Sequence, residues 1–124
     1  MKTLSVVAAN LLIAGLALAP SAPGEAASAG RGTKTVKVGD DFFSPTVTRI
    51  VRGSSVKWVW SSRNDNQHDV SLKTAPNGVR KGRFQSSTES AGFRFTRRFA
   101  KAGRYGFICN IHPDDMRMTV RVRR

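Results

Sequence analysis

Acidic residues are scarce in this 124-residue chain, which has 8 of them against 21 lysines and arginines. Only Lys2 and Glu25 among these precede residue 30, so residues 30–124 keep 20 basic and 7 acidic residues and a net charge of +13. Such a surface attracts anionic partners, which include acidic proteins, nucleic acids, polyanionic glycans and lipid headgroups. No nucleic-acid motif with spaced aromatic residues is present. Many basic residues alternate with apolar ones, which suits the outer face of a sheet.

Cysteine occurs once, as Cys109, so the chain cannot form a disulfide bond within itself. The N-terminal part combines Lys2, an apolar run over 4–19 and an A-x-A pattern at 27–29, and these features predict a secretory signal peptide over residues 1–29. A retained signal anchor is the alternative, and no cysteine lies near the cleavage region to serve as a lipid anchor. In oxidising surroundings cysteines usually pair, so Cys109 bonds another molecule, is inert in the core, or has a chemical role.

Long hydrophobic runs are absent after residue 30, and no segment there shows a helical hydrophobic stripe. We therefore expect a flexible leader over 30–33 and one soluble domain over 34–124, exported to the periplasm or the outside of the cell. Alternating and β-prone segments predict an all-β sandwich or barrel. The expected strands cover 34–38, 46–51, 56–60, 68–73, 93–99, 104–109 and 118–124. The polar segment 74–92 is compatible with a short helix or a flexible loop.

The surroundings of Cys109 suggest a metal site. A thiolate, two imidazoles and a weak thioether form the ligand set of blue-copper centres, and the chain has only two histidines, His68 and His112. His112 and Met116 follow Cys109 in a loop beyond an expected strand, whereas His68 must come from a neighbouring strand. Zinc fits less well because it does not use a thioether.

A cysteine beside a histidine can also indicate a catalytic thiol. That activity needs a substrate cleft, an oxyanion hole and usually a third orienting group. A sandwich of about 95 residues with two histidines leaves little room for them. We therefore expect no enzymatic activity.

The motif Gly103-x-Tyr105-x-Phe107-x-Cys109-x-x-His112, followed by a methionine and a final strand, resembles the cupredoxins, small blue copper proteins related to plastocyanin and amicyanin. The resemblance covers residues 34–123 and includes Phe-x-Pro at 43–45, Gly53 before a Val-x-Trp strand, and His68. It implies a Greek-key β-sandwich that holds one copper ion, Cu(I) or Cu(II), near one end. His68, Cys109 and His112 would be equatorial ligands and a methionine the axial ligand. His112, flanked by Ile111 and Pro113, would be the port for single electrons.

Two features depart from the family pattern. Met116 follows the histidine after three intervening residues and Met118 after five, whereas family loops have two or four; we favour Met116 as the axial ligand, because Met118 alternates with core positions of the last strand. Asp69 stands where the family often has an asparagine that bridges the ligand loops. Asn110 can donate a hydrogen bond to this carboxylate, which would preserve the bridge in altered form.

The favoured function is that of a monomeric electron carrier with an acidic redox partner protein. A copper-binding protein for storage, delivery or resistance would use the same ligands. A metal-free module that binds polyanions through its basic surface is the third possibility.

Overall fold

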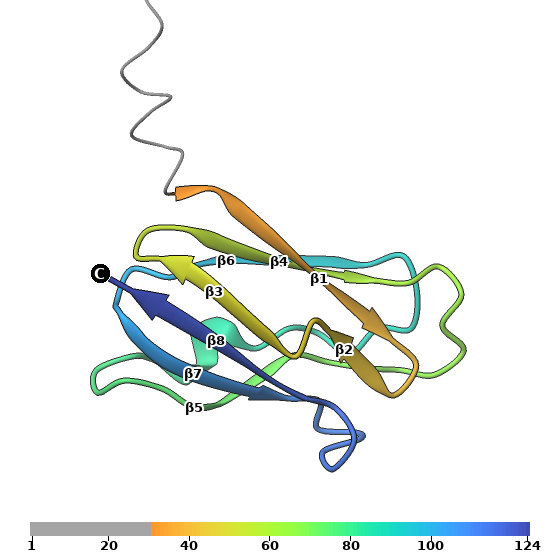
Figure 1. Cartoon of the computed structure of the whole chain (residues 1–124). Helices are drawn as coiled ribbons and strands as arrows, with labels where there is room; N and C mark the ends of the chain where they lie inside the picture. Colours follow the sequence, from red (N-terminus) through yellow and green to blue (C-terminus); the bar gives the residue numbers. More distant parts are fainter. Residues whose placement is uncertain (1–30) are drawn as a thin grey trace, which may run out of the picture.

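The computed structural model describes residues 31–124 (Figure 1). The expected signal peptide over 1–29 lies outside the described residues, as does the first residue of the expected leader over 30–33. Thr33 already belongs to the first strand, where it pairs with Ser55. In the described part of the chain, no helix has the length and apolarity needed to cross a membrane.

Two four-stranded sheets pack face to face (Figure 1). The strand order is β2-β1-β4-β6 in one sheet and β3-β8-β7-β5 in the other. The strands are β1 (Thr33–Gly39), β2 (Phe42–Ser44), β3 (Val47–Val51), β4 (Ser55–Trp60), β5 (Ser71–Thr74), β6 (Arg94–Arg98), β7 (Gly103–Ile108) and β8 (Arg117–Arg123). This arrangement confirms the predicted all-β Greek-key β-sandwich.

The alternation in the sequence sets which side chains form the core. In β4, Val56, Trp58 and Trp60 are buried, and the residues between them are partly exposed. The Trp58 ring lies against Phe95 and Phe107 from both sheets, with ring centroids 5.7 and 4.9 Å away. Aromatic side chains therefore join the two sheets in the middle of the sandwich.

Two local features differ from the sequence-based expectation, and a third agrees with one of the two alternatives left open for the segment 74–92. The strand expected over 68–73 begins at Ser71, because residues 68–70 are all buried and His68 forms only an isolated bridge with Glu89. The short strand β2 was not expected, since three residues give too little alternation to detect. The polar segment 74–92 contains one turn of 3-10 helix, η2 (Lys81–Phe84), whose Phe84 is buried.

The sandwich has two distinct ends. β1, β4 and β7 finish at the same end, so the segments 40–41, 61–70 and 109–116 gather there (Figure 1). We call it the ligand end. At the other end, called the distal end, β3, β6 and β8 finish and β1 begins. The turns there are joined by hydrogen bonds from Arg52 N to Arg123 O and from Gly53 N to Phe99 O.

Candidate metal centre

His68, Cys109 and His112 come together at the ligand end. One ligand atom from each of them lies within 4.8 Å of the other two. The Cys109 Sγ and His112 Nδ1 atoms are 3.9 Å apart, and the two imidazole ring centroids are 5.0 Å apart. His68 and Cys109 are fully buried, whereas the side chain of His112 is 24% exposed.

The loop after β7 brings His112 back to Cys109. Cys109 N donates to Met116 O at 3.1 Å, and Met116 N donates to His112 O at 3.0 Å. These two bonds close the loop 109–116 on itself and tie Met116 to both Cys109 and His112. Cys109 is therefore fixed by the end of a strand and His112 by a short hydrogen-bonded loop.

His68 is held in place from the other side of the site. Its backbone exchanges hydrogen bonds with Glu89, at 2.9 Å for His68 N to Glu89 O and 3.0 Å for the reverse. Its carbonyl also accepts a bond from Trp60 Nε1 at 3.1 Å. The backbone of His68 is thus bound to two separate segments, although it lies outside the regular strand.

Each histidine turns its Nε2 atom toward an aspartate of the β1–β2 turn. His68 Nε2 is 2.9 Å from Asp40 Oδ1, and His112 Nε2 is 3.4 Å from Asp41 Oδ1. Hydrogen bonds from the Asp65 backbone and from His68 lower the pKa of Asp40 to about 2, so its carboxylate is ionised and accepts a hydrogen bond from Nε2–H of His68. That bond leaves the lone pair of His68 on Nδ1.

Within residues 31–124, no group hydrogen-bonds to the buried Nδ1 atom of His68. A buried polar atom without a partner is costly, and a metal ion is one group that would satisfy it. The donor atoms next to it are a thiolate sulfur and a second imidazole nitrogen, which together suit copper in both oxidation states. The residues present therefore fit a single copper ion.

Asp40 and Asp41 are part of the site that the sequence does not predict. They are separated from His68 and His112 by tens of residues and meet them only through the turn between β1 and β2. The only signal in the sequence is two adjacent carboxylates in a chain that has few. That signal alone is too weak to point to a histidine.

The predicted bridge between Asp69 and Asn110 is present. Asn110 donates to the Asp69 carboxylate from its backbone N at 2.7 Å and from Nδ2 at 2.9 Å. Gln85 Nε2 adds a third bond at 3.2 Å, and Asp69 N lies 3.4 Å from Cys109 Sγ. Asp69 directly follows His68, and Asn110 directly follows Cys109. Their hydrogen bonds therefore tie the His68 segment to the Cys109 segment.

The two methionines have different surroundings. Met118 lies in β8, and its sulfur accepts a hydrogen bond from Trp58 Nε1 at 3.2 Å in the core. Met116 is fully buried in the loop that carries His112. Met118 thus has a packing role of its own, which leaves Met116 as the thioether of the ligand loop.

Comparison with known proteins agrees with this site. Residues 31–123 match the family model described as copper binding proteins, plastocyanin/azurin family. No curated protein sequence gave a significant match.

Solved structures share the fold. The amicyanin of Paracoccus versutus superposes with a TM-score of 0.62 at 24% identity, over 73% of this chain and 80% of that chain. For a purple cupredoxin from Nitrosopumilus maritimus the TM-score is 0.60 at 24% identity, over 72% and 98% of the two chains. A copper-containing nitrite reductase from Thermus scotoductus SA-01 gives 0.64 at 28% identity, over 74% of this chain and 22% of that longer chain.

The match extends over nearly all of the described residues and includes the cysteine, both histidines and the final strand. The chain belongs to the plastocyanin/azurin family of copper-binding proteins, the cupredoxins.

Proposed function

We propose that this protein is an exported carrier of single electrons between redox partners, with no enzymatic activity of its own. The observation that carries the proposal is the cluster of His68, Cys109 and His112, in which two groups are buried and the third reaches the surface. When bound, copper supplies a one-electron couple between Cu(II) and Cu(I). The chain must hold the ligands still and give a partner access to one of them.

Hydrogen bonds outside the ligand cluster support a rigid site. Asp40 orients His68, Asp69 ties the two ligand segments together, and two backbone bonds close the loop 109–116. Such outer contacts fix ligand orientation before the metal enters. A site whose ligands move little between oxidation states favours fast electron exchange and suits a carrier better than a protein that must release its metal.

We propose Met116 as the fourth, axial ligand. It is fully buried in the ligand loop and its backbone hydrogen-bonds to both Cys109 and His112. The sulfur of Met118 is instead engaged by Trp58. A weak thioether completes the ligand set of a blue-copper site.

His112 is the proposed electron port. Its side chain is the most exposed of the three, and the neighbouring Ile111 is 46% exposed. Pro113, on the other side of His112 in the chain, is exposed as well. An exposed apolar rim around a metal ligand allows a partner to approach closely without a strong, slow-releasing contact.

The proposed partner is a redox protein that docks on this rim. The net charge of +13 predicts an acidic partner from the sequence alone. Because Asp41 faces His112 and Asp114 and Asp115 lie in the same loop as His112, the charge of the partner at this rim stays a prediction, which the salt dependence of electron exchange tests. Export is likewise proposed from the N-terminal segment, and the test is N-terminal sequencing of the protein recovered from cell fractions.

A spectroscopic titration tests the proposed site. Adding Cu(II) to the purified protein is expected to give strong visible thiolate-to-copper charge transfer, and Cys109→Ser is expected to abolish it. Met116→Gln is expected to shift this band and the reduction potential, whereas the matched Met118→Gln leaves both nearly unchanged. A protein that stays colourless with copper, or one whose thiol remains open to alkylation in its presence, contradicts the proposal.

Electrochemistry then tests the role. A carrier is expected to show a rapid, reversible one-electron couple and slow exchange of bound copper with a chelator. A coloured protein that exchanges copper quickly and gives no reversible couple would instead point to copper storage or delivery.

A further inference from the structure

The few acidic side chains of the described chain all lie at the ligand end. They are Asp40, Asp41, Asp65, Asp69, Glu89, Asp114 and Asp115. Asp40 and Asp41 face the two histidines, and Asp65 N donates to Asp40 at 2.9 Å. The remaining four lie in the loop 109–116 or hydrogen-bond to residues that flank or include the ligands. Within residues 31–124, the distal end thus has no carboxylate side chain to balance its basic residues.

Arginines stand side by side toward the distal end. Arg121 of β8 is the register partner of both Arg49 in β3 and Arg104 in β7. All three side chains are exposed, and none of them takes part in an ion pair found among residues 31–124. Like charges directly opposite each other on a sheet are destabilising, so an anionic partner on this surface would relieve the repulsion.

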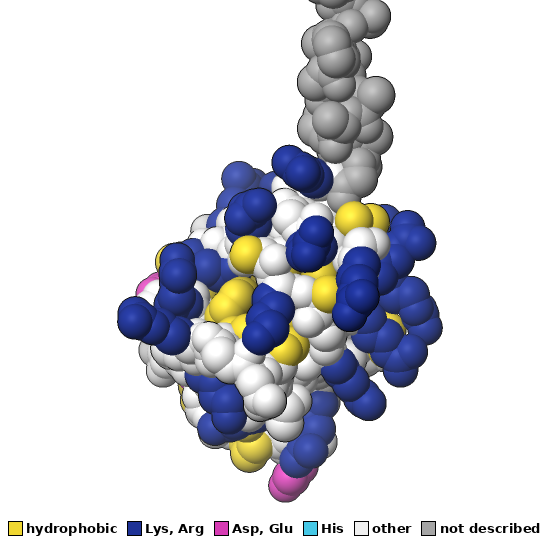
Figure 2. Space-filling view, turned by 90° about the vertical axis from the view of Figure 1, so that its left-hand side faces the viewer, with side chains coloured by type: hydrophobic (Ala, Val, Ile, Leu, Met, Phe, Trp, Pro, Cys, Tyr) yellow, Lys and Arg dark blue, Asp and Glu magenta, His cyan; other side chains and the backbone are white. Residues whose placement is uncertain are grey.

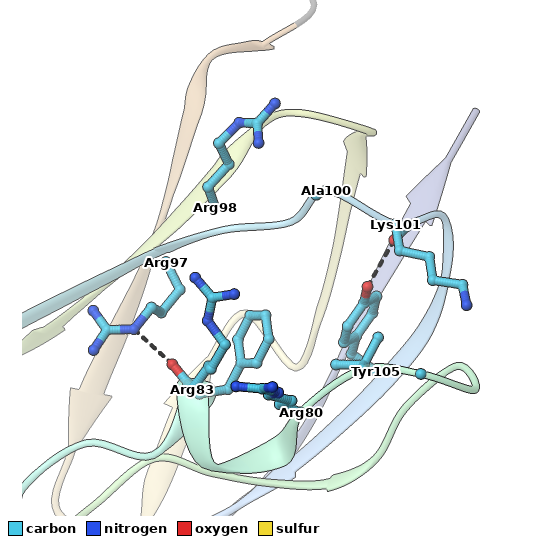
Figure 3. Close-up of a pocket in the computed structure, with 10 residues that line it drawn as sticks. Arg80, Arg83, Arg97, Arg98, Ala100, Lys101 and Tyr105 are labelled. Carbon is cyan, nitrogen blue, oxygen red and sulfur yellow. Dashed lines mark hydrogen bonds between the residues drawn. The ribbon is translucent and has the colours of Figure 1, made fainter.

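A basic cavity lies between η2 and the turn that joins β6 to β7. Its volume is about 520 Å³, and its cationic lining consists of Arg80, Arg83, Arg97, Arg98 and Lys101. Arg97 and Arg98 lie on one side of it, and Lys101 lies on the other, next to Tyr105 (Figure 3).

The side chains of this cavity are partly fixed in advance. Arg97 donates from Nε to Arg83 O at 2.7 Å, and its guanidinium stacks on Phe95 at 4.1 Å from the ring centroid. Tyr105 Oη donates to Lys101 O at 2.7 Å. None of the cavity's cationic side chains forms an ion pair within the described part of the chain. Arg97 is thus the one arginine of the cavity for which contacts of the guanidinium are seen among the described residues. Arginine side chains can bind phosphate oxygens through paired hydrogen bonds.

The basic character extends over the whole distal end. Figure 2 shows Lys and Arg side chains over most of this face, with hydrophobic side chains between them and acidic ones only at its margins. The described chain also begins here, because β1 starts at the distal end (Figure 1). The apolar sequence 4–19, for as long as it is attached, therefore joins the domain at its most basic end.

We propose that the distal end docks on an anionic phospholipid bilayer, and that the arginines of the cavity hold lipid phosphate groups. The charge complementarity and the point where the N-terminal segment joins the domain both favour a membrane over a soluble anion. Docked in this way, the protein directs its ligand end and His112 away from the membrane and toward a partner. The contact needs no copper and does not depend on the proposed electron transfer.

The test compares binding of the full chain to vesicles of phosphatidylcholine with and without phosphatidylglycerol. The measured quantity is the ratio of the two partition coefficients. The unmodified chain and every variant carry the same N-terminal segment, including Lys2, so the contribution of this segment cancels when their ratios are compared. We expect a ratio well above one that falls as salt rises. Each basic residue near an anionic surface contributes about fivefold to the partition coefficient, so Arg80→Glu/Arg98→Glu/Lys101→Glu is expected to lower the ratio at least about a hundredfold.

A matched triple variant separates the distal end from net charge. Lys37→Glu/Arg63→Glu/Arg94→Glu makes the same charge change in the half nearer the ligand end, where Lys37 and Arg94 both pair with Val59. This second triple variant is expected to keep most of the preference for vesicles that contain phosphatidylglycerol. Amide exchange on vesicles is expected to slow at residues 79–84 and 97–104 and to stay unchanged at 109–116.

Four results would overturn the proposal. The first is no preference of the unmodified chain for anionic vesicles, and the second is an equal loss in the two triple variants. The third is complete displacement from vesicles by soluble glycerol phosphate, which would show that the cavity binds a free phosphate. The fourth is retention on heparin without vesicle binding, which would assign the surface to a polyanion.

Discussion

Replacing Asp69 by alanine is the sharpest test of how the ligand segments are held together. The substitution removes the acceptor of two short hydrogen bonds from Asn110 and of a longer one from Gln85. A hydrogen bond to a charged group contributes about 1.5–3 kcal/mol. Asn110 is exposed and water can replace part of what it loses, so two bonds at the low end of this range give about 3 kcal/mol.

Urea denaturation of the copper-free protein measures this loss in the free energy of unfolding. Asp69→Asn keeps one good acceptor and is expected to lose about half as much as Asp69→Ala. The double variant with Asn110→Ala is expected to show a coupling energy of about 1 kcal/mol or more, because the two side chains act as a pair.

The copper-loaded protein gives a second readout. The Asp69 carboxylate accepts a hydrogen bond from the backbone N of Asn110, the residue after Cys109. Removing this negative charge disfavours the more highly charged Cu(II) ion, so we expect the reduction potential of Asp69→Ala to rise. The reasoning would be refuted if Asp69→Ala unfolded within about 0.5 kcal/mol of the unmodified protein and the two single substitutions were additive. An unchanged reduction potential would refute the proposed tie to the copper site separately.

Three further outcomes follow from local geometry. Gly103→Ala is expected to lower the free energy of unfolding by about 2 kcal/mol, because Gly103 has φ +142° and an added Cβ would collide with the Pro76 ring; Gly82→Ala, which meets nothing within 4 Å, is the control in the same urea assay. Met118→Leu is expected to cost about 1–2 kcal/mol by leaving the indole N–H of Trp58 unpaired, with the copper colour retained. Because the pKa of Asp40 is lowered from 3.8 to about 2, its stabilising contribution is complete above pH 3.8 and lost as the pH falls toward 2, and acid titration of Asp40→Asn is expected to show a shallower decline.

The strands that could be predicted from the sequence are those with one buried and one exposed face. β4 and β8 alternate in the sequence as they alternate in burial, so the positions of Val56, Trp58 and Val120 could be assigned to the core in advance. Cys109 and His112 could be placed together because the loop between them is short. A close spacing in sequence leaves few ways to arrange the side chains.

The less predictable parts depend on contacts between distant segments. The segment 68–73 alternates in the sequence, but residues 68–70 are all buried and His68 pairs only with Glu89, so this alternation does not mark the start of β5. Asp40 and Asp41 reach the histidines only because β1 and β7 both finish at the ligand end of the sandwich. Such contacts follow from the topology, and no local pattern in the sequence carries them.

The uneven distribution of charge over the molecule limits what its net charge of +13 says about a partner at His112. The distal end lies about 20 Å from the ligand end, as judged from the seven residues of β8 at about 3.3 Å each. The screening length at physiological salt is about 8 Å. A partner at His112 therefore experiences mainly the nearby charges, which include Asp41, Asp114 and Asp115. The excess of arginine acts instead on whatever faces the distal end, so the surface that attracts anions and the surface that exchanges electrons are different parts of the molecule.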